Sequence, residues 1–296
     1  MIPNKLENVD LTNEEFKTET GSLKNNILQV QIQNPKEIKK EWKFLNYLGS
    51  GRYGRIKKCI FKEGKKACVI KSIKATFGSK FYVVMELCKY GSLRTITDNA
   101  ILTLNEIKFV AASIYLGLKI LRKKFIIHQD LKVENIFVDK NGYLKIGDFG
   151  ISNFNHGENK SFRGTFGYLA PEIIDGKVYS YSVDYFALGC ILYYCATGSL
   201  TIDYSSRYSK SYLKHLSRQR VIVPKTVHFG IRNFINKLTV QSPIGRLGHE
   251  RVEEIEGHEF LNKFDFKDFY LKRNHREASE DVDFLVPRTD LSPQKE

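Results

Sequence analysis

Short apolar runs at the spacing of β-strands fill the chain between residues 42 and 88. Turns that contain glycine separate most of these runs, a pattern typical of a small antiparallel sheet. The four expected strands are Phe44–Leu48, Arg55–Phe61, Ala67–Ile73 and Phe81–Leu87. After Gly91 the apolar residues recur at helical spacing instead. The pattern therefore predicts an α+β fold, with the sheet first and the helices after it.

Two segments of the second part have the clearest helical pattern. Between Asn105 and Arg122, apolar residues line one face of a helix. Between Val183 and Thr197 almost every residue is apolar, and Gly198 supplies a stop signal. A helix that is apolar all round is typical of a protein interior. We therefore expect the second helix to be buried.

The composition limits the class of protein. Of the 296 residues, 42% are hydrophobic and 27% are charged, and only 7 are proline, which excludes wholesale disorder. No apolar run is long enough to span a membrane, and the first residues lack a hydrophobic signal segment. We therefore expect a cytoplasmic protein without a membrane span. Its five scattered cysteines lack the paired spacing of a zinc site and are expected to be reduced core thiols.

The formal net charge of +14 would attract polyanions. The basic clusters, such as residues 62–66 and Arg122–Lys124, are however short and lack interleaved aromatic residues for base stacking. We interpret these clusters as solvated turns, and we do not expect nucleic acid as a partner.

A glycine-rich loop joins the first two expected strands. Its sequence, from Gly49 to Ile56, contains three glycines, which let the backbone approach phosphates closely. Lys71 ends a later strand, where its amine could reach the same phosphates. Either feature alone is weak evidence, because a glycine-rich hairpin and a lysine at a strand end are both common.

Three further motifs, in order, point to phosphoryl transfer. They are His128–Asn135, Asp148-Phe149-Gly150 and Ala170-Pro171-Glu172. Phosphoryl transfer needs an acid that accepts the substrate hydroxyl proton, a cation near the γ-phosphate and hard oxygen ligands for magnesium. The motifs supply all three, and their order and spacing would rarely arise by chance.

On these motifs the chain resembles the eukaryotic protein kinases, from Trp42 to Asp268. Lys132, two residues after Asp130, resembles the residue that serine/threonine kinases carry at this position. The segments Ser242–Gly248 and Val252–Ile255 resemble the end of the catalytic domain in the AGC group, in particular in the cyclic-nucleotide-dependent kinases. The resemblance implies a two-lobe fold, with ATP in the cleft between a small antiparallel β N-lobe and a mainly helical C-lobe. It also implies the domain boundaries: a polar N-terminal arm (1–41), a kinase domain (42–268, with the N-lobe at 42–88 and the C-lobe at 89–268) and a short C-terminal tail (269–296).

The resemblance also implies the partners and the site residues. Mg²⁺ and ATP would be the cofactors, a protein Ser/Thr side chain the substrate, and a separate regulatory subunit a possible partner. Asp130 would be the base and Lys132 would neutralise the transferred group. Thr165 would lie in the substrate floor, where it could contact both. Asn135 and Asp148 would bind Mg²⁺. The residues implied to contact ATP are Leu48, Gly49, Ser50, Gly51, Arg52, Tyr53, Gly54, Ile56, Lys71, Glu86 and Cys88, with Met85 as gatekeeper.

Two structural roles follow in the same way. Glu172 would pair with Arg246, and Asp184 would brace the catalytic loop from the buried helix. Glu134 matches the acid that attracts a basic residue upstream of the phosphorylated residue. Kinases that prefer basic substrates carry further acidic residues at two other positions, which hold Ser92 and Gly167 here. We therefore do not expect a strict preference for arginine in the substrate.

The chain departs from the family pattern in its first lobe. Lys71 and Met85 are only 14 positions apart, and no acidic residue lies between Lys71 and Glu86. In the family this interval carries a helix whose Glu pairs with the Lys. That helix is expected to be missing, which would expose one sheet edge. Either the arm before residue 41 covers this edge or the first lobe is unusually labile.

Further departures concern regulation and nucleotide affinity. Gln129 replaces the Arg that would pair with a phosphate on Ser161, the aligned activation-loop position. The tail lacks the terminal hydrophobic motif of the group, and Val69 replaces a smaller Ala above the adenine. Three interpretations stay open: an active serine/threonine kinase, a pseudokinase or scaffold, and a skipped exon in the gene model that removes the helix.

Overall fold

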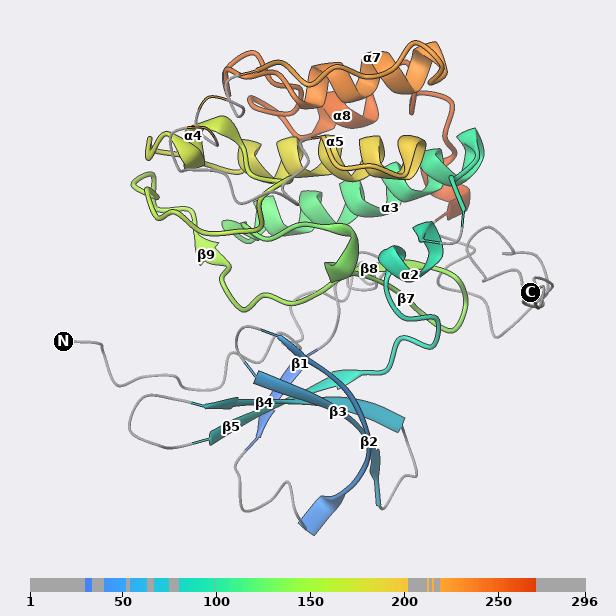
Figure 1. Ribbon diagram of the computed structural model, residues 1–296, viewed down its shortest axis with the longest axis vertical. Helices are drawn as coiled ribbons and strands as arrows, with labels where there is room; N and C mark the ends of the chain where they lie inside the picture. Colours follow the sequence, from blue (N-terminus) through green and yellow to red (C-terminus); the bar gives the residue numbers. More distant parts are fainter. Residues whose placement is uncertain are drawn as a thin grey trace. The chain divides into compact units, whose positions relative to one another are not determined.

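The computed structural model describes residues 30–33, 40–51, 54–62, 67–74, 80–98, 100–201, 212, 215 and 219–269. The chain divides into two compact units, residues 1–87 and 88–296, and each is described by itself. The first unit is a β-sheet and the second is mainly helical (Figure 1). The predicted α+β fold, with the sheet first, is therefore confirmed.

The described residues of the first unit form one antiparallel sheet in the order β1-β5-β4-β3-β2. Its strands are β1 (Val30–Gln33), β2 (Trp42–Gly51), β3 (Gly54–Phe61), β4 (Ala67–Lys74) and β5 (Lys80–Glu86). The last four coincide with the four runs expected from the sequence. The sheet has five strands rather than about four, because the segment expected to be an arm contributes β1.

Strand β1 covers the edge of β5. The two strands are antiparallel, with Val30 opposite Met85 and Gln33 opposite Tyr82. The sequence left two alternatives, an arm before residue 41 that covers the exposed edge or an unusually labile first lobe. The backbone pairing of β1 with β5 supports the first. A sheet edge presents unpaired N–H and C=O groups, so this pairing satisfies groups that would otherwise face solvent or another chain.

Strands β4 and β5 form a direct hairpin. Lys74 lies opposite Lys80, and Lys71 lies opposite Val83. Only residues 75–79 separate the two strands, and they lie outside the described residues. Between Lys71 and Met85 every described residue is in a strand, so the described part of this interval contains no helix, as the sequence predicts.

Apolar side chains on one face of the sheet form the core of the first unit. The cluster consists of Trp42, Cys59, Cys68, Ile70 and Val84, with Phe61 and Tyr82 packed against it. The Trp42 and Phe61 rings lie 5.0 Å apart between centroids. The five cysteines of the chain, all among the described residues, are buried thiols, as predicted.

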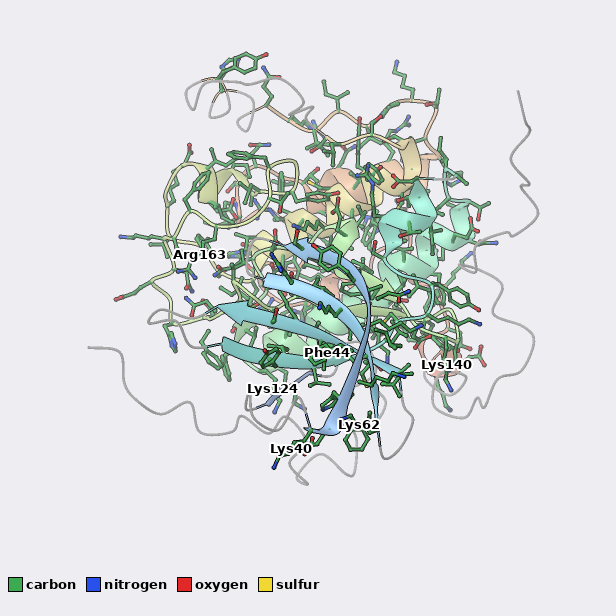
Figure 2. All side chains as sticks on the ribbon, turned by 60° about the horizontal axis from the view of Figure 1, so that its bottom comes forward. Lys40, Phe44, Lys62, Lys124, Lys140 and Arg163 are labelled. Atoms are coloured by element: carbon green, nitrogen blue, oxygen red, sulfur yellow. The ribbon has the colours of Figure 1, made fainter. Side chains whose placement is uncertain are left out.

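The start of β2 is tied to the end of β3. The Lys62 amide donates to the Glu41 carbonyl at 2.8 Å, and its Nζ donates to the Lys40 carbonyl at 2.6 Å. Figure 2 shows Lys40 and Lys62 at the same end of the sheet. The start of β2 is therefore fixed at this end of the sheet.

A variant that lacks residues 1–39 should lose hydrogen-exchange protection in β5. Removing β1 leaves the outer groups of Tyr82–Met85 without their strand partner, and one backbone hydrogen bond contributes about 1 kcal/mol. We expect amide exchange of β5 to accelerate by about tenfold, measured by mass spectrometry. Peptides from the helices of the second unit should stay unchanged and serve as the internal control. Unchanged protection in β5 would contradict the structural role of β1.

The described part of the second unit contains α-helices, two short strand pairs (β6 with β9, and β7 with β8) and a 3-10 turn. Its elements are α2 (Leu93–Thr97), α3 (Leu104–Lys123), β6 (Ile126–Ile127), η4 (Val133–Asn135), β7 (Ile136–Val138), β8 (Leu144–Ile146), β9 (Asn153–Phe154), α4 (Pro171–Ile174), α5 (Ser182–Thr197), α7 (Phe229–Leu238) and α8 (Glu253–Glu256). Helices α3 and α5 pack side by side, and α7 packs on α5 (Figure 1). In the described part of the chain, no helix combines the length and the apolar character that a membrane crossing requires.

The two long helices have clear local causes. Helix α3 begins with a capping box, in which Glu106 accepts the Thr103 backbone N–H at 2.6 Å and Thr103 Oγ1 accepts the Glu106 N–H at 3.3 Å. Helix α5 is buried along nearly its whole length and ends at Gly198, whose φ of 72° is left-handed. Both helices agree with the sequence prediction.

Arg122 differs from the prediction that its basic cluster is a solvated turn. Its guanidinium donates to the carbonyls of Gly248 (2.7 Å), His249 (3.3 Å) and Glu250. It also donates to the Tyr185 hydroxyl at 3.2 Å. Arg122 thus joins the end of α3 to the chain before α8. The sequence pattern did not predict this role, because the carbonyl partners are far from Arg122 in the sequence.

Candidate active site

The catalytic-loop motif is held from behind by a buried carboxylate. Asp184 Oδ2 accepts the His128 backbone N–H at 2.8 Å, and its Oδ1 accepts that of Gln129 at 2.9 Å. Burial raises the pKa of Asp184 to about 7, although the two backbone hydrogen bonds favour the charged form. Gln129 has a positive φ of 68°, so these bonds fix a strained turn immediately before Asp130. The bracing contact expected for Asp184 is present.

His128 links this loop to the segment before Asp148. Its Nε2 lies 3.0 Å from the Gly147 carbonyl, and its Nδ1 accepts the Asp130 backbone N–H at 3.3 Å. Burial lowers the pKa of His128, which favours the neutral ring. A neutral ring that donates through Nε2 and accepts through Nδ1 satisfies both contacts. The ring also packs edge-on against Phe149, with 4.9 Å between centroids.

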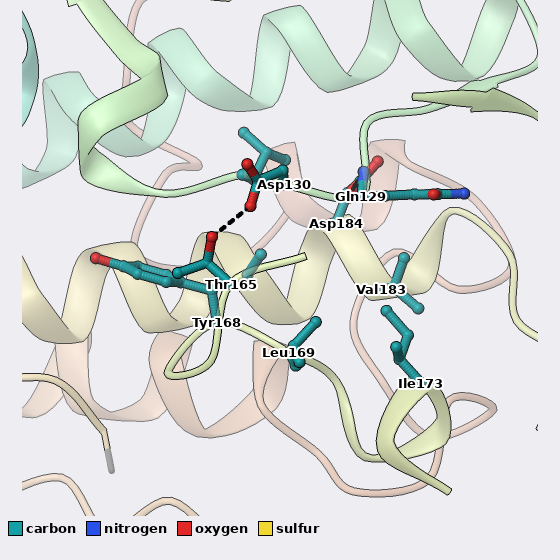
Figure 3. Close-up of a pocket in the computed structure, with 10 residues that line it drawn as sticks. Gln129, Asp130, Thr165, Tyr168, Leu169, Ile173, Val183 and Asp184 are labelled. Atoms are coloured by element: carbon teal, nitrogen blue, oxygen red, sulfur yellow. Dashed lines mark hydrogen bonds between the residues drawn. The ribbon is translucent and has the colours of Figure 1, made fainter. Parts of the chain in front are cut away.

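Asp130, Lys132 and Thr165 form one connected group. The Thr165 hydroxyl donates to Asp130 Oδ1 at 2.6 Å, as Figure 3 shows. Lys132 Nζ donates to the Thr165 hydroxyl at 2.8 Å and lies 3.1 Å from Asp130 Oδ2. The contact of Thr165 with both residues, expected from the sequence, is therefore present. The Lys132 ammonium and the Asp130 carboxylate are therefore held together by the Thr165 hydroxyl.

Asn135 is tied to the same carboxylate. Its Nδ2 donates to the Asp130 carbonyl at 2.8 Å and lies 3.3 Å from Asp130 Oδ2. The Asn135 carbonyl accepts the Gly147 N–H at 2.9 Å, which brings Asp148 close to the loop. Asp148 has a left-handed φ of 56°, a conformation that Asp tolerates better than most residues.

The donor set fits a magnesium ion bound partly by phosphates. Because Nδ2 of Asn135 is used by Asp130, its Oδ1 is the end that can bind a cation, and Asp148 supplies a carboxylate. Mg²⁺ takes oxygen ligands and is commonly held by one or two protein groups plus substrate phosphates. In the described residues, no three His, Cys, Asp or Glu side chains gather into a metal-binding group of their own.

A small cavity of about 10 Å³ lies beside Asp130 and is lined by Gln129, Thr165 and Asp184 among others. Figure 3 shows the Gln129 side chain pointing away from Asp130. Both polar atoms of its amide are buried, and neither has a hydrogen-bond partner among the described residues. Gln129 therefore leaves a buried amide where the resemblance implies an arginine.

The segment before Thr165 touches the loop closely. A Cβ added at Gly164 would lie 2.7 Å from the Gln129 carbonyl and 2.6 Å from Leu169, and the φ of Gly164 is 119°. Only glycine fits this approach without displacement.

The Ser161 hydroxyl lies 3.1 Å from the Tyr179 hydroxyl, which in turn donates to the Ser161 carbonyl at 2.9 Å. Ser161 is thus held by Tyr179.

Glu172 and Arg246 form the expected ion pair. Arg246 donates to Glu172 Oε1 at 2.6 Å and Oε2 at 2.9 Å, and the two side chains are 0% and 3% exposed. Arg246 also donates to the carbonyls of Ser182 (2.8 Å) and Val240 (3.0 Å). The pair therefore connects α4, the start of α5 and the chain after α7.

The first unit carries the residues expected to contact ATP phosphates. Leu48, Gly49, Ser50 and Gly51 end β2, and Gly54 and Ile56 begin β3, whereas Arg52 and Tyr53 lie outside the described residues. A Cβ at Gly54 would collide with the Ser72 carbonyl, so a side chain cannot be added there. Lys71 is buried in β4, opposite Ile56 of β3. The described residues of the glycine-rich loop thus belong to the same sheet as Lys71.

The expected adenine-binding residues lie along the sequence where the chain passes from the first unit to the second. Met85 and Glu86 end β5, and Cys88 begins the second unit. The Cys88 carbonyl accepts the Gly91 N–H at 3.3 Å, and the Tyr90 N–H donates to the Val138 carbonyl at 3.3 Å. The chain beyond Cys88 is therefore fixed to β7.

The second unit thus brings together Asp130, Lys132, Thr165 and Asn135, and it places Asp148 nearby. Sequence reasoning missed the two-sided role of His128 and the close approach of Gly164 to Gln129. A histidine that begins the motif and a glycine just before Thr165 were the available signals. A contact between Arg94 and Glu134, at 3.6 Å, had no signal in the sequence.

Comparisons with known proteins agree with this arrangement. The family model of the protein kinase domain matches residues 75–261. A putative ribosomal protein S6 kinase alpha-2 from Caenorhabditis elegans is 34% identical over 219 residues, which are 71% of this chain and 28% of the relative. Ribosomal protein S6 kinase alpha-2 from Homo sapiens is 31% identical over 199 residues, 65% of this chain and 27% of the relative.

The chain spans about a quarter of the length of these curated relatives. Their similarity confirms the resemblance to serine/threonine kinases of the AGC group. The match to the family model covers more than half of the chain and includes every site residue of the second unit from Asp130 to Thr165. On this ground the chain belongs to the protein kinase family.

Proposed function

We propose that the chain is a serine/threonine protein kinase that transfers the γ-phosphoryl group of Mg-ATP to hydroxyls of a protein substrate. The observation that carries the proposal is the connected group of Asp130, Lys132 and Thr165, with contacts of 2.6 to 3.1 Å. Its relatives are named as ribosomal protein S6 kinases, which supports a protein as the substrate. These comparisons lend no support to the pseudokinase alternative.

The proposed roles follow from the chemistry of each side chain. Asp130 orients the substrate hydroxyl and accepts its proton, because its carboxylate has an acceptor site beyond those that Thr165, Lys132 and Asn135 use. Lys132 places a positive charge where negative charge develops on the transferred group. Thr165 holds both side chains in place.

The nucleotide would be bound by the residues that the resemblance implies. In the first unit, the glycine-rich loop and Lys71 bind phosphates, and the backbone of Glu86 binds adenine together with that of Cys88. Asn135 Oδ1 and Asp148 hold the divalent ion, which neutralises phosphate charge when bound. A cytoplasmic location and a separate regulatory subunit stay predictions.

The proposal is tested by phosphoryl transfer from γ-labelled ATP to a basic peptide that contains serine. We expect label on the peptide with Mg²⁺ and none after the metal is chelated, because oxygen ligands such as Asn135 and Asp148 bind the nucleotide phosphates only through a cation. Thermal unfolding with and without Mg-ATP provides a second measurement. A shift in melting temperature without label on any peptide would contradict the proposal and indicate a nucleotide-binding scaffold.

A further inference from the structure

We infer that Arg94 competes with basic side chains of the substrate for Glu134 and thereby weakens the preference of the site for basic peptides. This inference rests on the proposed kinase function. Arg94 Nη1 lies 3.6 Å from Glu134 Oε1, and both side chains are partly exposed, at 40% and 43%. An internal cation therefore already faces this carboxylate at the surface.

Glu134 lies close to the proposed reacting group. It belongs to η4, directly before Asn135, whose amide contacts Asp130. Glu134 follows Asp130 by four positions, so their Cα atoms are at most about 15 Å apart, and the 3-10 turn shortens this distance. An extended peptide advances about 3.3 Å per residue. A long basic side chain two or three residues from the phosphorylated serine would therefore reach Glu134.

Glu134 offers a substrate cation the same oxygen that Arg94 faces. Its Oε2 is buried and has no hydrogen-bond partner within the described part of the chain, so an incoming side chain meets the exposed Oε1 side. A carboxylate attracts a cationic donor, and a charged donor forms the stronger hydrogen bond. Left uncovered, Glu134 would favour substrates with Lys or Arg at the matching position.

Arg94 is held in place from two other sides. Its Nε lies 2.6 Å from Oδ1 of Asp98, the C-cap residue of α2, and its guanidinium lies 5.2 Å from the centre of the Tyr194 ring. The segment before it is anchored too, because Ser92 forms a β-bridge with Phe137 of β7. These contacts keep the guanidinium beside Glu134 without help from a substrate.

The shared charge sets the size of the effect. Arg94 faces two carboxylates, Asp98 and Glu134, and it is nearer to Asp98. The contact with Glu134 is partly exposed, and exposed ion pairs contribute little. Arg94 should therefore reduce the attraction of Glu134 for a substrate cation several-fold rather than abolish it.

The test uses two peptides that differ only in Arg or Ala at the position two residues before the serine, and a second pair that differs three residues before it. For each pair, two ratios are measured: kcat/KM of the Arg peptide over that of the Ala peptide, and Kd of the Ala peptide over that of the Arg peptide, from fluorescence anisotropy. We expect Arg94→Gln to increase both ratios about fivefold for one of the pairs. Arg232→Gln, which removes an arginine of α7 that faces the Lys225 carbonyl, is the matched control for net charge and should leave them unchanged.

A double-substitution cycle separates the local contact from a general charge effect. In the Glu134→Gln background both ratios should approach one, and adding Arg94→Gln should then change nothing. Ratios that are insensitive to Arg94→Gln, or that rise equally without Glu134, overturn the inference. A Kd ratio that rises in Arg94→Gln, in a protein that transfers no phosphoryl group, would support the inference and contradict the proposed kinase function. Failure of the inference and failure of the proposed function are therefore distinguishable.

Discussion

The Asp130→Asn variant is expected to lose between about a hundredfold and about ten-thousandfold in kcat, the usual range for a lost general base. The substitution keeps the size of the side chain but replaces one acceptor oxygen by an NH₂ group. That group would meet the Lys132 ammonium or the Thr165 hydroxyl, which now donate to the carboxylate. The variant therefore loses both the proton acceptor and the charge that holds Lys132.

The measurement is the initial rate of label transfer from ATP at saturating peptide, with thermal unfolding to verify that the variant is folded. The KM for ATP should change little, because the proposed nucleotide-binding residues are elsewhere. Asp265→Asn is the matched control, since Asp265 caps the Asp268 N–H through a single oxygen that asparagine retains. A kcat within fivefold of the unmodified protein would show that Asp130 is not the base.

The Arg246→Met variant is expected to lose about 3–5 kcal/mol of unfolding free energy in the second unit, as when one partner of a buried ion pair is removed. Arg246 is fully buried and donates to both oxygens of Glu172. Without it, Glu172 is a buried charge lacking its cation. The carbonyls of Ser182 and Val240 also lose their donor.

Urea unfolding of this variant can be followed separately in each unit. Far-UV circular dichroism reports the helices of the second unit, whereas fluorescence of the single tryptophan, Trp42, reports the first. Only the dichroism transition should shift. The double variant Glu172→Leu/Arg246→Met should recover part of the loss, because it leaves no uncompensated charge. A loss below 1 kcal/mol for Arg246→Met would contradict this account.

The local motif was the most predictable part of the site. Asp130, Lys132 and Asn135 lie within six residues, so a single loop and a short 3-10 turn are enough to bring them together. Their identity follows from the chemistry that phosphoryl transfer requires. The partners from further along the chain, Thr165 and Asp184, were expected only through the family resemblance, and the structure shows both contacts.

Gln129 marks a limit of sequence reasoning within the motif. The sequence shows that the expected arginine is missing, and it predicts the loss of a partner for a phosphate on Ser161. It does not show what the replacement does. In the structure the Gln129 amide is buried without a partner among the described residues, and Ser161 is bound by Tyr179.

The sequence by itself determined the order of sheet and helices, the catalytic-loop motif and the short interval after Lys71, whose described residues contain no helix. Periodicity, motif spacing and the number of residues between two positions can all be read along the chain. Tertiary structure decided that β1 completes the sheet beside β5 and that Arg94 faces Glu134. Strand pairing uses backbone groups common to all residues, so the chain carries little local signal for which edge it will cover. The Arg94 contact depends on how α2 packs against η4, and a one-dimensional pattern does not contain that distance.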